Sequence, residues 1–126
     1  METAGKRVLV AEDDRFLRRA CEMSLRHLGF TVLLAKDGEE ALTMIQDQRP
    51  DLVLLDLLMP KLTGLEVLRT MKSAEATRSI PVLILTNSSR AQDIEEIREL
   101  GADGYQIKAN LSLEALGTQI KKLLKD

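Results

Sequence analysis

Two kinds of segment alternate along this chain, and the alternation restricts its fold more than any other feature. Short runs rich in valine, isoleucine and leucine occupy residues 7–11, 31–35, 51–55, 81–85 and, more weakly, 104–107. Each run has the length of a strand, and the middle runs are apolar on both faces, as buried parallel strands are. After each run, apolar residues recur at intervals of three and four, which predicts five helices.

The predicted helices carry residues that typically begin or end a helix. Asp14 and Ser112 stand just before the first and fifth apolar stripes, where a side-chain oxygen can cap the free N–H groups. Gly29 and Gly101 follow the first and fourth stripes, where glycine commonly ends a helix. These positions support the alternation of strands and helices.

Five strand–helix units in a row imply an α/β fold, in which a doubly wound parallel sheet has helices on both faces. Right-handed crossovers leave few topologies, and the flavodoxin-like order 2-1-3-4-5 is the commonest at this size. The chain has 126 residues, without an internal repeat or a linker. We therefore expect one domain over residues 1–126.

Charge and composition exclude several classes of function. The formal net charge is −2, which argues against direct binding to nucleic acid or to an anionic membrane surface. Lys121, Lys122 and Lys125 fit the last turn of a helix better than a basic tail. The chain has no signal peptide and no run long enough to span a bilayer, and its one cysteine, Cys21, fits a buried thiol. We expect a soluble, cytoplasmic protein.

Polar residues gather where the predicted strands end. Ligands of open parallel sheets bind outside the carboxyl ends of the strands. The residues found there are Glu12, Asp13 and Asp14 after the first strand, Asp56 after the third, Thr86 after the fourth and Lys108 after the fifth. Acids, a hydroxyl and an amine therefore converge on one rim of the sheet.

Some of these acids have simpler interpretations. Asp14 is most simply an N-cap, and Glu12 and Asp13 could form a solvated acidic turn. Asp56 differs because it interrupts an apolar run, where a carboxylate costs several kcal/mol unless it is paired or bound to metal. A site with only oxygen ligands suits Mg²⁺, whereas His27, the only histidine, leaves no ligand set for zinc.

Four motifs in order resemble the response-regulator receiver family of two-component signalling. They are residues 8–14 (VLVAEDD), residues 56–60 (DLLMP) with Gly64, residues 80–86 (IPVLILT) and residues 101–108 (GADGYQIK). The resemblance covers essentially the whole chain. It implies a phosphoryl-accepting signalling domain rather than a turnover enzyme, supplied by a histidine kinase or a histidine phosphotransfer protein.

The resemblance also implies roles for single residues. Asp56 would accept the phosphoryl group. Asp13 and Asp56 would bind Mg²⁺ directly, together with the backbone carbonyl of Leu58, while Glu12 would act mainly through water.

On the phosphoryl side, the resemblance implies that Lys108 and Thr86 contact the phosphoryl oxygens. Thr86 and Tyr105 would form the switch, because reorientation of Thr86 lets Tyr105 move inward. That movement would repack the face made by the fourth helix, fifth strand and fifth helix, where a downstream protein or a second copy of the chain could bind.

Two residues depart from the family pattern. Ala109 follows Lys108 where receivers usually have a proline in the cis form, and Asn87 follows Thr86 where a smaller residue is usual. A cis bond before alanine costs about 2.5–4 kcal/mol, so we expect the bond between Lys108 and Ala109 to be trans.

Other functions compete with a stand-alone receiver. A receiver cut from a longer regulator would share every motif. A Mg²⁺-dependent α/β phosphatase would use Asp56 as nucleophile, but such enzymes generally need an acid two residues later, where this chain has Leu58. A flavodoxin-like cofactor binder would need a phosphate loop rich in glycine, serine or threonine after the first strand, and the chain lacks one.

Overall fold

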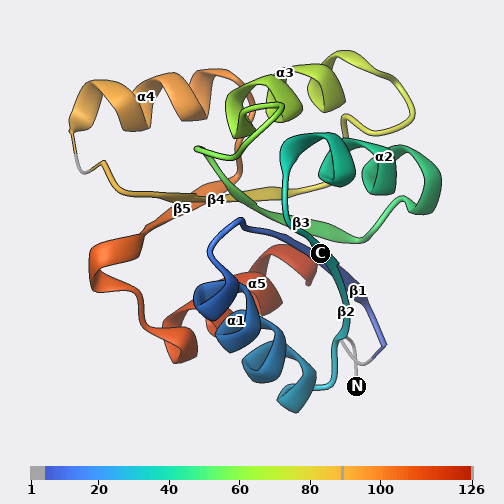
Figure 1. Ribbon diagram of the computed structural model, residues 1–126, viewed down its shortest axis with the longest axis vertical. Helices are drawn as coiled ribbons and strands as arrows, with labels where there is room; N and C mark the ends of the chain where they lie inside the picture. The colour runs from blue at the N-terminus through green and yellow to red at the C-terminus, as the bar shows by residue number, and fades with distance from the viewer. Residues whose placement is uncertain (1–4, 89, 126) are drawn as a thin grey trace.

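The computed structural model describes residues 5–88 and 90–125 and shows one parallel sheet between two layers of helices (Figure 1). The strands lie in the order β2-β1-β3-β4-β5, and all four pairings are parallel. Their bounds are β1 (Arg7–Ala11), β2 (Thr31–Ala35), β3 (Leu52–Asp56), β4 (Val82–Thr86) and β5 (Gly104–Ile107). The predicted flavodoxin-like topology is confirmed.

Helices cover both faces of the sheet. On one face lie α1 (Arg15–His27) and α5 (Leu113–Leu124), and on the other lie α2 (Gly38–Gln48), α3 (Gly64–Ser73) and α4 (Ala91–Glu99) (Figure 1). A short 3₁₀ helix, η1 (Lys108–Asn110), follows β5. In the described ranges no helix is long and apolar enough to cross a membrane.

Alternate residues of the central strands supply two separate cores. In β3, Leu52 and Leu54 pack towards α1 and α5, whereas Val53 and Leu55 pack towards α2 and α3. All four side chains are fully buried. Burial on both faces explains why the middle strands are apolar without alternation.

The expected caps and the buried thiol are confirmed. Asp14 caps α1 by accepting N–H donations from Phe16 and Leu17, and Ser112 caps α5. Gly29 and Gly101 have positive φ just after α1 and α4. Burial raises the pKa of the Cys21 thiol to about 11, so the neutral thiol is the stable form.

Strands β3 and β4 begin and end one residue later than the sequence predicted. Asp51 precedes β3 and instead bonds Arg7 twice: its N–H donates to the Arg7 carbonyl, and its Oδ2 accepts from the Arg7 N–H at 2.7 Å. Pro81 has no N–H and stands just before β4. As a result, Asp56 and Thr86 are the last residues of their strands and are held by the sheet.

Candidate functional site

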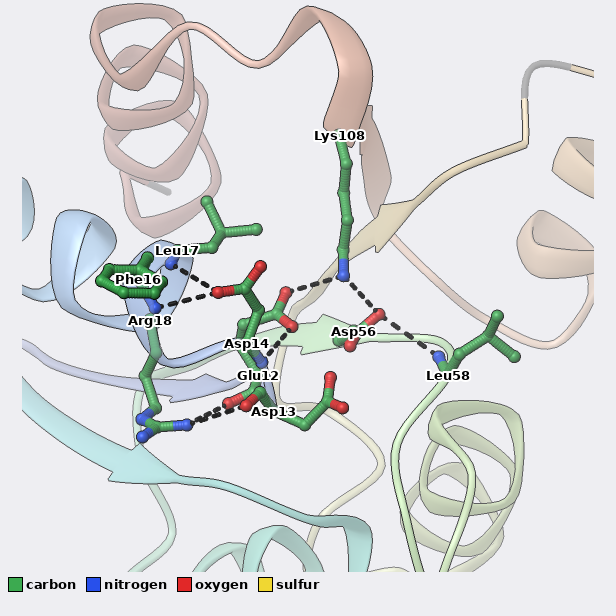
Figure 2. A network of polar contacts seen from close by, with 9 residues as sticks. All are labelled: Glu12, Asp13, Asp14, Phe16, Leu17, Arg18, Asp56, Leu58 and Lys108. Carbon is green, nitrogen blue, oxygen red and sulfur yellow. Dashed lines mark hydrogen bonds and ion pairs between the residues drawn. The ribbon is translucent and has the colours of Figure 1, made fainter.

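Three carboxylates meet where β1 and β3 end (Figure 2). Glu12 and Asp13 follow β1, and Asp56 ends β3. One carboxylate oxygen of each residue lies within 4.8 Å of the others. Glu12 and Asp56 are buried and Asp13 is exposed, so the cluster opens to solvent on the Asp13 side. Oxygen ligands at this spacing fit a hard divalent cation.

The two oxygens of Asp56 have different surroundings. Oδ1 accepts a hydrogen bond from the Leu58 N–H at 3.2 Å and lies 3.0 Å from Nζ of Lys108. Oδ2 is buried and has no hydrogen-bond partner among the described residues. A buried carboxylate oxygen without a partner costs free energy, and a bound cation would satisfy it.

Burial, together with the neighbouring carboxylate of Glu12, raises the pKa of Asp56 to about 7, although Lys108 opposes both effects. Partial burial lowers the pKa of Lys108, but its contacts with Glu12 and Asp56 raise it overall. Near neutral pH the acid cluster is therefore short of positive charge, which a divalent cation would supply.

Glu12 points inward rather than into solvent. Its Oε2 accepts from the Asp14 N–H at 3.0 Å. Its Oε1 lies 2.9 Å from Nζ of Lys108, and the two form a close ion pair whose angles do not fit a hydrogen bond. The interpretation of Glu12 as part of a solvated turn is therefore wrong, whereas Asp13 is exposed and Asp14 serves as a cap outside the cluster.

Arg18 fixes the backbone of the acidic turn and was missed in the sequence. Its Nη1 donates to the Glu12 carbonyl at 2.8 Å and to the Asp13 carbonyl at 3.4 Å (Figure 2). Arg18 lies one helical turn after Asp14, so its side chain can reach back over the start of α1. The spacing of four residues between Asp14 and Arg18 was the sequence feature that could have predicted this contact.

Thr86 lies beside the acid cluster at the end of β4. It is buried, and its Oγ1 accepts a hydrogen bond from the Ser88 N–H at 3.0 Å. Asp56, Leu58 and Thr86 line a common hollow of about 300 Å³, and Asp93 of α4 lines it as well. The structure thus brings the predicted acceptor and the predicted switch hydroxyl to the same cavity.

Tyr105 lies on β5, one strand further from the acids. It pairs with Ile84 in the sheet and is half-buried against the core under α2, α3 and α4. Its ring lines a second hollow of about 130 Å³, together with Ile94 and Ile97 of α4 and Gln119 of α5. The aromatic side chain therefore has free space beside it on the α4–β5–α5 face.

The loop after Asp56 folds closely over the acceptor. The Gly64 N–H donates to the Leu57 carbonyl at 2.8 Å. A Cβ on Gly64 would lie 2.1 Å from the Asp56 carbonyl oxygen, so only glycine fits there. Within this loop Leu58 offers its N–H to Asp56, and its side chain is 71% exposed.

Comparison with known families agrees with this geometry. Residues 8–121 match the family model described as the response regulator receiver domain. The chain belongs to this family. As a receiver domain it is 40% identical over 119 residues to response regulator MprA of Mycolicibacterium vanbaalenii. It is 39% identical over 125 residues to a probable transcriptional regulator, ycf27, of Cyanophora paradoxa.

The chain spans about half the length of these curated relatives. The match covers 94% of the chain and 50% of MprA, and 99% of the chain and 51% of the ycf27 protein. The two proteins therefore contain sequence that has no counterpart in these 126 residues.

Solved receiver structures share nearly the whole fold. The Francisella response regulator 1452 receiver domain superimposes with a TM-score of 0.90 at 28% identity, covering 96% of this chain and 98% of that one. The receiver domain of sensor histidine kinase PA1611 from Pseudomonas aeruginosa superimposes with a TM-score of 0.88 at 28% identity, covering 98% and 100%. The latter structure is described with a magnesium ion coordinated in its active site cleft.

Proposed function

We propose that Asp56 accepts a phosphoryl group from a phosphohistidine donor, either a histidine kinase or a histidine phosphotransfer protein, in a Mg²⁺-dependent reaction. The observation that carries the proposal is the buried Oδ2 of Asp56, which has no hydrogen-bond partner among the described residues and lies beside two further carboxylates and the Lys108 ammonium. Structural stability alone does not favour such a cluster, because like charges in a buried site repel each other.

The transfer replaces one bond to phosphorus with another. A carboxylate oxygen of Asp56 forms the new P–O bond while the P–N bond of the phosphoimidazole breaks. The departing nitrogen keeps the bonding electron pair, and the imidazole leaves as a neutral group when its other nitrogen carries a proton. The product is an acyl phosphate on Asp56.

The surrounding residues would position and neutralise the group. Mg²⁺ would be held by Asp13, Asp56 and the Leu58 carbonyl, and Glu12 would act through water. The bound ion would supply positive charge to the phosphoryl oxygens. The Lys108 ammonium would contact one phosphoryl oxygen. It already lies 3.0 Å from Oδ1 of Asp56.

The response would begin at Thr86 and end on the α4–β5–α5 face. The Thr86 hydroxyl would turn to donate to a phosphoryl oxygen, and Tyr105 would then move inward. A downstream protein, or a second copy of the chain in a homodimer, would then bind the altered face in the cytoplasm.

Coverage of only half of MprA favours a second form of the same proposal, in which the domain controls an attached output domain. The length of the complete gene distinguishes the two forms. In either form we expect no turnover of a chromogenic phosphate ester, because the position two residues after Asp56 carries the apolar Leu58 instead of an acid.

Phosphorylation by acetyl phosphate tests the acceptor. With Mg²⁺ present, intact-mass spectrometry should show one added phosphoryl group on the wild type and none on Asp56→Asn. Asp47→Asn, an exposed carboxylate of α2, is the matched control and should be phosphorylated normally. Equal phosphorylation of wild type and Asp56→Asn would refute the assignment.

A further inference from the structure

The loop between β3 and α3, residues 57–63, rests on the N-terminus of α2. The Gly38 N–H donates to the Pro60 carbonyl at 3.3 Å. A Cβ on Gly38 would lie 1.7 Å from the Leu62 carbonyl oxygen. The φ angle of Gly38 is not positive, so the position needs glycine for space and not for a left-handed backbone.

Asp37 provides a second contact between α2 and this loop. Its Oδ1 caps α2 by accepting from the Glu40 N–H at 2.8 Å, and its Oδ2 lies 3.6 Å from Nζ of Lys61. Lys61 has φ of 71°, a left-handed conformation that its own side chain disfavours. The buried carboxylate therefore faces the strained part of the loop.

Both ends of the loop are fixed at the acceptor. Leu57 follows Asp56 directly, and its carbonyl accepts from the Gly64 N–H at 2.8 Å. Between these ends, Leu58 donates to Oδ1 of Asp56. With its ends attached to the acceptor, the path of the loop depends on where its middle is held, which is on α2.

We propose that Gly38 and Asp37 are positioning residues for the metal site. They seat residues 60–62 against α2 and thereby set the direction of the Leu58 backbone relative to Asp56. The inference rests on the proposed function, in which the Leu58 carbonyl binds Mg²⁺. Neither residue touches the ion, and each acts through the loop.

A Mg²⁺ titration followed by ¹H–¹⁵N NMR tests this role. Gly38→Ala should displace the Leu58 amide resonance before Mg²⁺ is added, because the new methyl group pushes the loop away. It should also weaken Mg²⁺ binding by about 10- to 100-fold, the usual effect of disturbing residues that support metal ligands.

Gly117→Ala is the matched control for crowding. The added Cβ would lie 2.6 Å from Cδ1 of Leu28, on the opposite face of the sheet. This variant should bind Mg²⁺ with unchanged affinity and leave the Leu58 amide in place. Normal affinity in Gly38→Ala, or an equal loss in Gly117→Ala, would overturn the inference.

Asp37→Asn and Lys61→Met keep the test decisive if Gly38→Ala does not fold. Asparagine still caps α2 but loses the charge that attracts Lys61. Both variants should weaken Mg²⁺ binding less than Gly38→Ala does and shift the same Leu58 resonance, and wild-type behaviour in both would overturn the inference. Absence of Mg²⁺ binding by the wild type would instead refute the proposed function itself.

Discussion

The Lys108 ammonium lies 3.0 Å from Oδ1 of Asp56, although the peptide bond that follows Lys108 is trans. Receivers usually have a cis proline after this lysine, and here the next residue is Ala109. No cis peptide bond occurs in residues 5–88 and 90–125, so the predicted trans bond is confirmed. Helix η1 begins at Lys108 and turns the chain at once, and the flexible lysine stem covers the remaining distance.

Lys108→Met should destabilise the metal-free protein at pH 8. Without the ammonium, the buried carboxylates of Glu12 and Asp56 lose the cation that contacts them both. We expect the free energy of unfolding to fall by about 1–3 kcal/mol, measured by urea denaturation with circular dichroism. The loss should shrink at pH 5, where Asp56 holds a proton.

Lys121→Met is the control for that experiment, because Lys121 is exposed in the last turn of α5. It should change the free energy of unfolding by less than about 0.5 kcal/mol. A similar loss in both lysine variants would show that Lys108 does not compensate the acids.

Asp56 should make the metal-free protein less stable as pH rises. Its pKa is about 7 in the folded chain against 3.8 for the free side chain. Between these values the folded state holds a proton that the unfolded state has lost, so the free energy of unfolding falls from pH 4 to pH 7 and then levels off. Asp56→Asn cannot titrate and should flatten this slope.

The same variant should be more stable than the wild type at pH 8 and similar to it at pH 4. Urea denaturation in the presence of a metal chelator, repeated at several pH values, measures the free energy of unfolding of both proteins. If the two proteins show parallel pH profiles, the raised pKa is not a property of Asp56.

The sequence predicted the sheet and most of the site because both depend on local signals. Apolar runs placed every strand to within one residue, and the strand order brought Asp56, Thr86 and Lys108 to one rim. The strand order alone predicts that these three residues lie close together, since the carboxyl ends of parallel strands lie at the same edge of the sheet.

Other parts of the site depend on contacts that the sequence does not signal. The inward direction of Glu12 follows from Lys108, almost a hundred residues later in the chain. The contact between Gly38 and Leu62 follows from how two loops meet, and neither loop has an apolar period that could reveal it. Close approach of two backbones can be seen only in three dimensions.

Asp13→Asn should remove the response to Mg²⁺. Mg²⁺ at saturation should stabilise the wild type by about 1–3 kcal/mol through mass action. The variant should itself be more stable than the metal-free wild type, because one of three clustered charges is gone. Calorimetric melting with and without Mg²⁺ measures both effects, and an unchanged Mg²⁺ response would remove Asp13 from the metal site.

Leu58→Asn should shorten the lifetime of the phosphorylated state. The Leu58 side chain lines the hollow that Asp56 and Thr86 share, where an attacking water would approach the phosphoryl group, and it is 71% exposed. An apolar side chain cannot orient that water for attack on phosphorus. An amide could do so with one hydrogen bond, whose net value of about 0.5–1.5 kcal/mol corresponds to at most about a tenfold faster hydrolysis.

Loss of the phosphorylated species after removal of acetyl phosphate can be followed by intact-mass spectrometry. Leu58→Met is the matched control, because methionine has a similar volume and also lacks a group that could orient water. Its phosphorylated lifetime should equal that of the wild type. A longer lifetime in Leu58→Asn would show that hydrolysis is limited by access to the hollow and not by orientation of the attacking water.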